Sequence, residues 1–315
     1  MRRQSVAPSS LNGANVRSFR VRDLPDEIAL IRSIAQRTDF ERACAAVKPA
    51  RRVRGLIGVA LPAPLLAGLK AAARQAISRH GLHGWLSAEG REENSSYVSI
   101  SLTHNPDLKD SGVEDVHQST LGTSVNPPSE FYYGSVKRFA NLKNTYFDTY
   151  GFRVPTPAAG IGALGEFLSS CRLSPVRSRL SALVGAQAGA AGFHSGWHRD
   201  ESVFENLRIN VPLFSHRNYR LQIERERDHP DAGSTTMSEH FLAPGKAYTF
   251  DTHRPHRVYG RAPCAVDRIH LVLGFSPWFR YDRKADSWAP NEFYGRVHPF
   301  DIVRSGALHP ALRGD

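Results

Sequence analysis

The alternation of hydrophobic and polar positions changes character about two thirds of the way along the chain. Residues 24–83 read as mainly helical. In "DEIALIRSIAQ" (26–36), apolar residues recur at helical spacing behind two acids, which suit a first helical turn. A second helix is predicted in "PAPLLAGLKAAARQAISRHG" (62–81), which has proline at its start and glycine beyond its end. The stretch 160–189 predicts one or two further helices, interrupted near Pro175.

Short segments that alternate or run apolar predict strands, first in "SYVSISLTH" (96–104) and then repeatedly after residue 189. The later ones are "LRINVPLF" (207–214), "YRLQIERE" (219–226), "KAYTFDT" (246–252) and "RIHLVLGFSP" (268–277). Turn residues separate them, and successive strands at this spacing are typical of an antiparallel sandwich or barrel. We therefore predict an α+β chain in which helices, mostly first in the sequence, accompany a jelly-roll (cupin-like) core.

The same pattern divides the chain into four parts. Residues 1–20 are polar and lack periodicity, which predicts a flexible N-terminus. Residues 21–190 form a mainly helical and loop-rich N-terminal part, 191–280 the jelly-roll core, and 281–315 a C-terminal extension. The N-terminal part contains a long turn-rich stretch, and long loops inside a compact domain usually carry function.

Charge narrows the range of partners. The net charge is +11, and most of the cations are arginine, which favours planar, bidentate binding of carboxylate and phosphate. The basic residues are spread along the chain and form no basic helix interleaved with aromatics, so we expect no nucleic-acid partner.

Cysteine usage and hydropathy indicate a cytoplasmic protein. Cys44, Cys171 and Cys264 lie far apart and form no C-x-x-C pair, which argues against a disulfide framework or a zinc knuckle. No apolar segment follows the initial "MRR", so we expect no signal peptide. The most apolar window is interrupted by Pro62 and Pro64, and we expect no membrane span.

The segment "WHRDESVFENLRINVPL" (197–213) contains a candidate half of a metal site. His198 and Asp200 stand at i and i+2 where a strand is about to begin, so on an extended backbone both side chains point to the same face. With one more histidine they would make a 2-His-1-carboxylate triad, which leaves three positions open on a metal and is typical of non-haem Fe(II) oxygenases. H-x-D alone is a common sequence, and the alternative is a charged surface loop.

The other half is predicted in "KAYTFDTHRPHRVYGRAPCAVDRIHLVLGFSP" (246–277). His253 and His256 follow an alternating strand, and either would supply the third ligand. Arg268 stands twelve residues after His256, at the head of another strand. A jelly-roll places such strands side by side, so this arginine could bind one end of a dicarboxylate whose other end chelates the metal.

Residues 193–278 resemble the aspartyl/asparaginyl β-hydroxylase family and its bacterial amino-acid hydroxylase relatives. The resemblance lies in "WHRDESVFENLRINVPL", "FLAPGKAYTFDTHRPHRVYG" and "DRIHLVLGFSPW". It implies a double-stranded β-helix with Fe(II) held by His198, Asp200 and His256. It also implies that Arg268 anchors 2-oxoglutarate, with Arg208 as a second basic residue near that cosubstrate.

Some animal members of this family have glycine at the position of Asp200. The carboxylate of this chain favours an iron site that is complete by itself, and it argues against a halogenase-like site, which would need that position vacant. The chain before residue 190 lies outside the resemblance, and we expect it to shape the substrate site.

The implied activity is hydroxylation of an unactivated C–H bond in an amino acid, free or within a peptide. Fe(II), 2-oxoglutarate and O2 would take part, with 2-oxoglutarate decarboxylated to succinate. The substrate would resemble Asp, Asn or Pro or be another acidic small molecule, and residues 191–280 would be the catalytic core. The alternatives are a cupin-like metal-dependent isomerase or hydrolase, a desaturase or cyclase with the same iron site, and a non-catalytic binding module. The sequence leaves the oligomeric state open.

Overall fold

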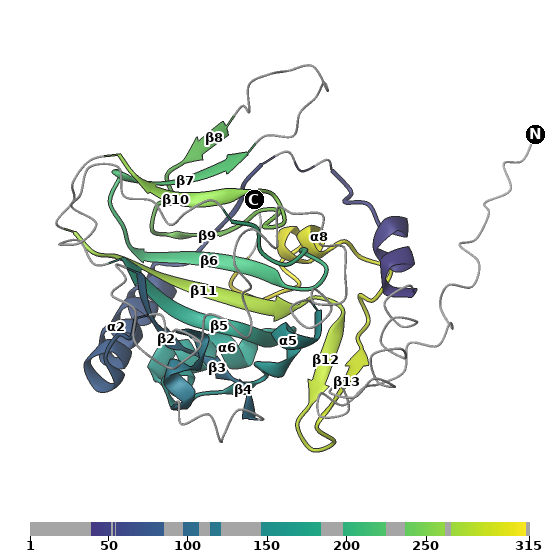
Figure 1. The fold of residues 1–315 in the computed structure, drawn as a ribbon, viewed down its shortest axis with the longest axis horizontal. Coiled ribbons are helices and arrows are strands. Elements are labelled where there is room, and N and C mark those ends of the chain that lie inside the picture. The colour runs from purple at the N-terminus through teal and green to yellow at the C-terminus, as the bar shows by residue number, and fades with distance from the viewer. Residues whose placement is uncertain are drawn as a thin grey trace, which may run out of the picture.

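The computed structural model describes residues 39–51, 53, 55–84, 97–106, 114–120, 146–183, 198–224, 237–261 and 266–312. The helix predicted in 26–36 and the flexible terminus predicted for 1–20 lie outside these ranges. Within them, the fold is α+β, with most strands in two antiparallel sheets (Figure 1). No helix in the described ranges combines the length and the apolar character needed to cross a membrane.

The larger sheet has six strands in the order β1-β9-β6-β11-β5-β2. Their bounds are β1 Ile57–Ala60, β2 Tyr97–Ser101, β5 Ser174–Leu183, β6 Leu207–Phe214, β9 Lys246–Thr249 and β11 Arg268–Ser276. The longest pairings are those of β11, which lies between β5 and β6 with Arg268 opposite Leu183 and Gly274 opposite Arg208. The sheet therefore joins segments that are far apart in the sequence.

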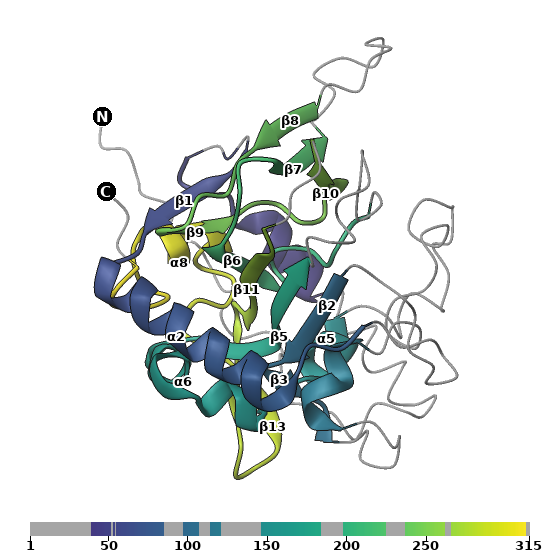
Figure 2. The ribbon, with the colours of Figure 1, turned by 90° about the vertical axis from the view of Figure 1, so that its left-hand side faces the viewer.

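The smaller sheet has the order β10-β7-β8, with bounds β7 Tyr219–Glu224, β8 Met237–His240 and β10 His256–Gly260. His198 forms an antiparallel bridge with His256 at the start of β10. In both ribbon views this sheet lies over the β9 and β6 side of the larger one (Figures 1 and 2). Leu221 and Ile223 of β7 belong to the same buried cluster as Tyr248 of β9, so apolar packing joins the two sheets.

The two faces of the larger sheet differ, because successive side chains of a strand point to opposite sides. In β11, Leu271 and Leu273 belong to the main apolar cluster, whereas Arg268 and His270 point to the opposite face. Helices α2 (Ala63–His80) and α6 (Gly162–Ser170) cover the apolar face (Figure 2). They approach closely at Gly68, where a Cβ would lie 2.7 Å from the Cβ of Ala163.

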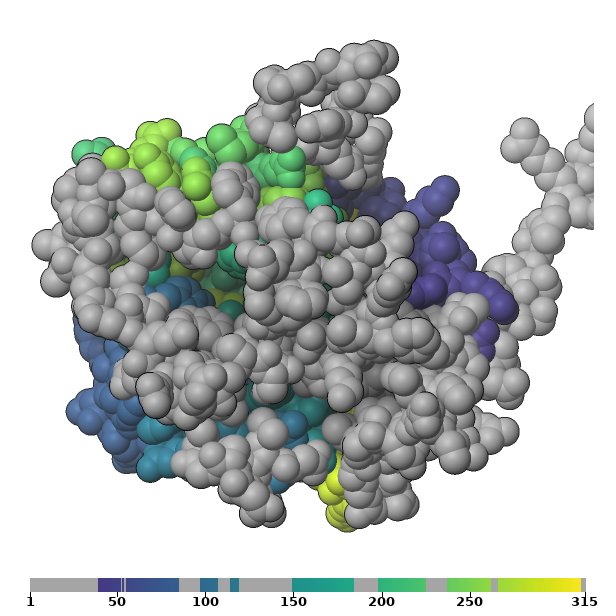
Figure 3. All heavy atoms as spheres, viewed as in Figure 1, coloured from purple at the N-terminus to yellow at the C-terminus, as the bar shows by residue number. Residues whose placement is uncertain are grey.

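Shorter elements make up much of the rest of the described chain, in addition to a helical segment over 39–46. They are β3 Thr103–His104, η3 Asp115–Thr120, α5 Tyr146–Gly151, β4 Val154–Pro155, η4 Pro157–Gly160, β12 Phe279–Asp282, β13 Ser287–Pro290 and α8 Pro299–Arg304. The β12–β13 hairpin carries a second aromatic cluster, in which Trp278 and Trp288 pack near Tyr150. Figure 3 shows the smaller sheet, in green, along the top of one face of the molecule.

The predicted α+β fold, with a double-stranded β-helix core and helices packed on it, is confirmed. The helix predicted in 62–81 is α2, which follows Pro62 and ends at Gly81 with φ of +71°. The strands predicted at 207–214, 219–226, 246–252 and 268–277 are β6, β7, β9 and β11. The four-part division of the chain stays a prediction, although β1, β2 and β5 of the larger sheet all precede residue 191.

Two secondary-structure predictions are wrong. The region 24–83 includes β1, which pairs with β9, and the second helix expected within 160–189 is instead β5. In β5 the polar residues Arg179 and Ser181 alternate with the apolar residues Leu180 and Ala182, and pairing with β11 and β2 outweighs the helical appearance of the neighbouring stretch. The strand conformation matters for the site, because it places Arg179 on the face of Arg268 and His270, and Arg177 reaches Glu201 at 3.0 Å.

Candidate metal centre

Backbone pairing brings the three predicted metal ligands together. The amide of His198 donates to the carbonyl of His256 at 3.1 Å, and the amide of His256 donates back at 2.9 Å. The amide of Asp200 donates to the carbonyl of Thr252 at 2.9 Å, so both ends of the segment 198–200 are fixed to 252–256. The potential ligand atoms of His198, Asp200 and His256 all lie within 4.8 Å of one another.

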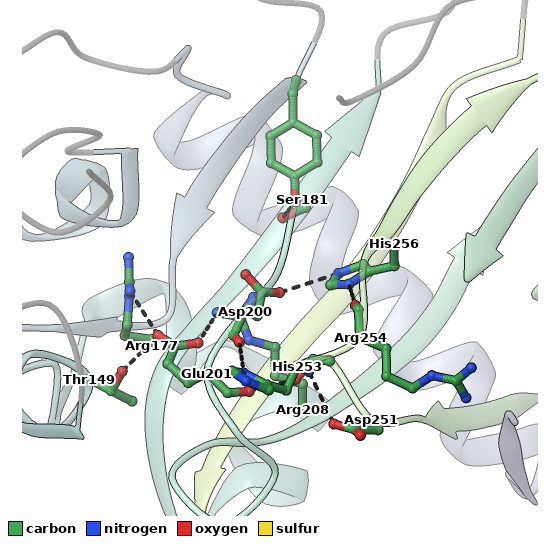
Figure 4. Close-up of polar contacts among 12 residues, drawn as sticks. Thr149, Arg177, Ser181, Asp200, Glu201, Arg208, Asp251, His253, Arg254 and His256 are labelled. Carbon is green, nitrogen blue, oxygen red and sulfur yellow. Dashed lines mark hydrogen bonds and ion pairs between the residues drawn. The ribbon is translucent and has the colours of Figure 1, made fainter. Parts of the chain in front are cut away.

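The ring of His256 is oriented for a cation beside Asp200. Its Nδ1 lies 2.9 Å from the carbonyl oxygen of Arg254, which can only accept, so Nδ1 carries a hydrogen. In the neutral ring, Nε2 then presents a lone pair 3.5 Å from Oδ2 of Asp200 (Figure 4). A lone pair and a carboxylate that face each other need a proton or a metal ion between them. A histidine whose second nitrogen is held by a carbonyl is the usual arrangement of a metal ligand.

His253 takes a different place. Its side chain is exposed, and its Nδ1 lies 3.4 Å from the backbone oxygen of Asp200. Its amide donates to Oδ1 of Asp251 at 3.1 Å, which fixes the turn before β10. The structure therefore groups His256, and not His253, with the other two candidate ligands.

Buried ion pairs surround the carboxylate of Asp200. Arg208 reaches Oδ2 of Asp200 at 2.9 Å with one nitrogen and Oε2 of Glu201 at 2.7 Å with another. Glu201 also receives Nη1 of Arg177 at 3.0 Å and the hydroxyl of Thr149 at 2.8 Å (Figure 4). Two arginines and two acids thus form a neutral quartet that links β5, β6 and the segment carrying the candidate ligands.

The quartet sets the charge state of both acids. Burial would raise the pKa of Asp200, but Arg208, His198 and His256 together hold it well below its usual range. Burial acts in the same direction on Glu201, and Arg208 and Arg177 lower its pKa to about 2. Both carboxylates are therefore anionic at neutral pH. Arg208 was predicted to lie near the cosubstrate. In the structure it forms ion pairs with Asp200 and Glu201, and this geometry favours a role in orienting the carboxylate of Asp200.

Arg268 begins β11 and is buried, with 6% of its surface exposed. Within the described ranges no carboxylate pairs with it. Burial lowers its pKa to about 10, and the nearby Tyr97 and Tyr219 offset only part of that effect. A buried cation without an anionic partner is costly, so the position has the character of an anion-binding site.

Sequence reasoning missed several residues of this site. Tyr97 comes from β2, and its hydroxyl donates to Oγ of Ser181 at 3.0 Å. Burial would raise the pKa of Tyr97, but Arg179, the hydrogen bond to Ser181, Arg268 and Arg208 together lower it. The guanidinium of Arg179 lies 5.9 Å from the centre of the Tyr97 ring. The polar and apolar residues in 174–183 were the sequence signal that could have identified Arg177 and Arg179. For Glu201 the sequence signal was its position next to Asp200.

Comparisons with known proteins give remote likenesses. No protein-family model matches the chain, and no curated protein matches its sequence. Among solved structures, the α-ketoglutarate-dependent epimerase SnoN of nogalamycin biosynthesis is 14% identical, with 80% of this chain and 83% of that chain covered at a TM-score of 0.38. AviO1 from Streptomyces viridochromogenes is 17% identical, with 74% and 94% covered and a TM-score of 0.36. A prolyl-4-hydroxylase from Pseudomonas putida is 13% identical, with 71% and 93% covered and a TM-score of 0.36. The function therefore has to be inferred from the site itself.

Proposed function

We propose that this protein is an Fe(II)- and 2-oxoglutarate-dependent oxygenase that hydroxylates an unactivated C–H bond of an amino acid, free or in a peptide. One observation carries the proposal. Two imidazoles and one carboxylate converge within 4.8 Å, on the same side of the larger sheet as a buried arginine that has no carboxylate partner within the described ranges. A metal alone would explain the first feature, but it would leave Arg268 unexplained.

The donor set suits a divalent iron. His198, Asp200 and His256 would occupy three positions of an octahedral ion and leave three for other ligands. When bound, iron with 2-oxoglutarate and O2 would supply the oxidising chemistry, with 2-oxoglutarate released as succinate and CO2. The surrounding residues would prepare the ligands: Arg254 fixes the ring of His256 through its carbonyl, and Arg208 fixes the carboxylate of Asp200.

Arg268 would bind the distal carboxylate of 2-oxoglutarate. A guanidinium matches a carboxylate with two parallel hydrogen bonds, and burial strengthens that pair because water does not screen it. The partner would also offset the cost of burying the cation. A cupin-like isomerase or hydrolase would use the same metal ligands without a dicarboxylate, so it gives Arg268 no such role. Desaturation and cyclisation would use the same ligands as hydroxylation, and product analysis distinguishes them.

The charges around the site favour an acidic substrate. Arg177, Arg179, Arg208 and Arg268 all act on titratable groups of the site, and Asp200 and Glu201 pair with two of these arginines, Arg177 and Arg208. Iron would add two positive charges and 2-oxoglutarate two negative ones. The remaining excess is positive, which attracts a substrate that carries a carboxylate.

Anaerobic titration of the metal-free protein with Fe(II), followed by 2-oxoglutarate, tests the proposal. We expect the visible charge-transfer band of the chelate in the wild type and its loss in His256→Ala. The matched control is His253→Ala, which removes a histidine three residues away and should keep the band. Succinate release with a panel of amino acids and acidic peptides would then identify the substrate. Absence of the band in the folded wild type would refute the proposal.

A further inference from the structure

His270 is a buried histidine whose ring has no hydrogen-bond partner among the described residues. It stands two residues after Arg268 in β11, on the same face of the larger sheet, and is 0% exposed. Neither Nδ1 nor Nε2 has a partner in the described part of the protein. His309 offers a contrast, because its Nδ1 accepts from the amide of Ala311 and only its Nε2 lacks a partner. Buried polar groups are almost always bonded, so two unmet nitrogens on one ring indicate a missing ligand.

The register places His270 between Arg268 and the candidate metal centre. Along β11, Arg268 lies opposite Leu183, His270 opposite Ser181 and Pro212, and Gly274 opposite Arg208. Arg208 in turn holds Asp200. A ligand that extends from Arg268 toward the metal ligands therefore has to pass the face of β11 that carries His270.

The chemistry of the ring fits an anion. Burial lowers the pKa of His270 well below its usual range, and the nearby Arg268 lowers it further, so the ring is neutral at physiological pH. A neutral imidazole carries one N–H, which can donate without adding another charge beside the arginine. The neighbouring hydroxyl of Ser181 accepts from Tyr97 and still has its own hydrogen to donate. Arginine, imidazole and hydroxyl together make a donor-rich position for a carboxylate.

We propose that His270 donates a hydrogen bond to the distal carboxylate of 2-oxoglutarate and so makes cosubstrate selection depend on that group. The inference rests on the proposed function, since it names a contact to the same cosubstrate. His270 is a specificity residue in this view, with no part in the oxidation itself.

Anaerobic binding with two 2-oxo acids tests the inference. The chelate band gives a dissociation constant for 2-oxoglutarate and for 2-oxopentanoate, which has the same chain length and no distal carboxylate. Hydrogen bonds to charged groups account for roughly tenfold to hundredfold in affinity. We therefore expect His270→Leu to weaken 2-oxoglutarate binding by that factor and to leave 2-oxopentanoate unchanged. His270→Asn, which keeps a donor, should retain most of the preference.

Controls separate this contact from a general effect on the fold. His309→Leu replaces another buried histidine, one that stacks on Phe167 of α6, and should change neither constant. His270→Ala serves if the leucine variant does not fold, with the same expectation. Equal weakening of both acids, or no change in either, would overturn the role of His270 while leaving the oxygenase proposal intact. Absence of the band in the wild type would instead overturn both.

Discussion

Replacing Arg268 with methionine should weaken cosubstrate binding and stabilise the free protein. The two effects have opposite signs because the same burial causes both. In the free protein the guanidinium is desolvated, and its pKa falls from an ordinary 12.5 to about 10. That fall corresponds to roughly 3 kcal/mol lost by the charged form. Methionine carries no charge and fits between Leu183 and the nearby tyrosines, so the variant should recover part of this energy, about 1–3 kcal/mol.

Binding of 2-oxoglutarate should change the other way. Removing one partner of a buried, hydrogen-bonded charge pair costs about 2–5 kcal/mol, which is roughly thirtyfold to several-thousandfold in affinity. The assay combines denaturant unfolding of the metal-free protein with anaerobic titration of the chelate band. Arg172→Met is the control, because Arg172 forms an exposed ion pair with Glu292 at 2.8 Å and its loss should change stability by less than about 1 kcal/mol.

Loss of stability in Arg268→Met by 2 kcal/mol or more would refute this reasoning. It would mean that the guanidinium already has a strong partner in the free protein and is not kept for a ligand. Unchanged 2-oxoglutarate affinity with raised stability would refute only the cosubstrate role. A combined result, with higher stability and weaker binding, is the trade-off expected of a functional group held in an unfavourable environment.

Two further predictions concern residues that hold the structure around the site together, namely Glu201 and Gly274. Glu201→Gln should lower stability at pH 7 by roughly 2–3 kcal/mol, because the pKa of Glu201 falls from 4.5 to about 2 in the folded protein. A depressed carboxyl pKa stabilises the fold above pH 4.5, and that contribution is lost as the pH falls toward 2. The variant should therefore lose less stability than the wild type over this range, and identical acid unfolding curves would contradict the ion-pair quartet. Gly274→Ala should destabilise by several kcal/mol, since its Cβ would lie 2.2 Å from the carbonyl oxygen of Val176 and 2.6 Å from Oδ1 of Asn206. Gly160→Ala, which meets nothing within 4 Å, is the control in the same unfolding assay.

Local patterns predicted the elements that depend on short-range order. Helix α2 was predictable because proline and glycine mark its two ends, and β6, β7, β9 and β11 because each alternates or runs apolar within four to nine residues. Strand β5 was missed because small and apolar residues on both sides of 174–183 resemble a helix. Its pairing with β11 and β2, both far away in the sequence, decides the conformation, and pairing at such a distance leaves no local signal.

The candidate site shows the same division between local and distant order. His198 and Asp200 were identified from their own spacing, whereas His256 was preferred over His253 only through the resemblance of residues 193–278 to a known family. The structure groups all three residues, although their role as iron ligands stays a prediction. The residues that surround them could not be found in this way. Arg177 lies where β5 bulges opposite Val272 and Gly274 of β11, and its contact with Glu201 joins segments with no sequence pattern in common. His270 is distinguished by its burial without partners among the described residues, which no local sequence pattern predicts.

The four residues 198–201 explain why the chain places opposite charges side by side before a strand. His198 and Asp200 face the position where a cation is needed, whereas Glu201 turns to Arg177 and Thr149 on the other side. Arg208 contacts both acids, so it couples the two sides and fixes the orientation of Asp200. The charges of Arg177 and Arg208 cancel those of Asp200 and Glu201. None of these four side chains is therefore an unpaired buried charge when a metal ion binds. Arg268 lies outside this quartet, and no carboxylate among the described residues pairs with it, so its charge can meet that of a ligand.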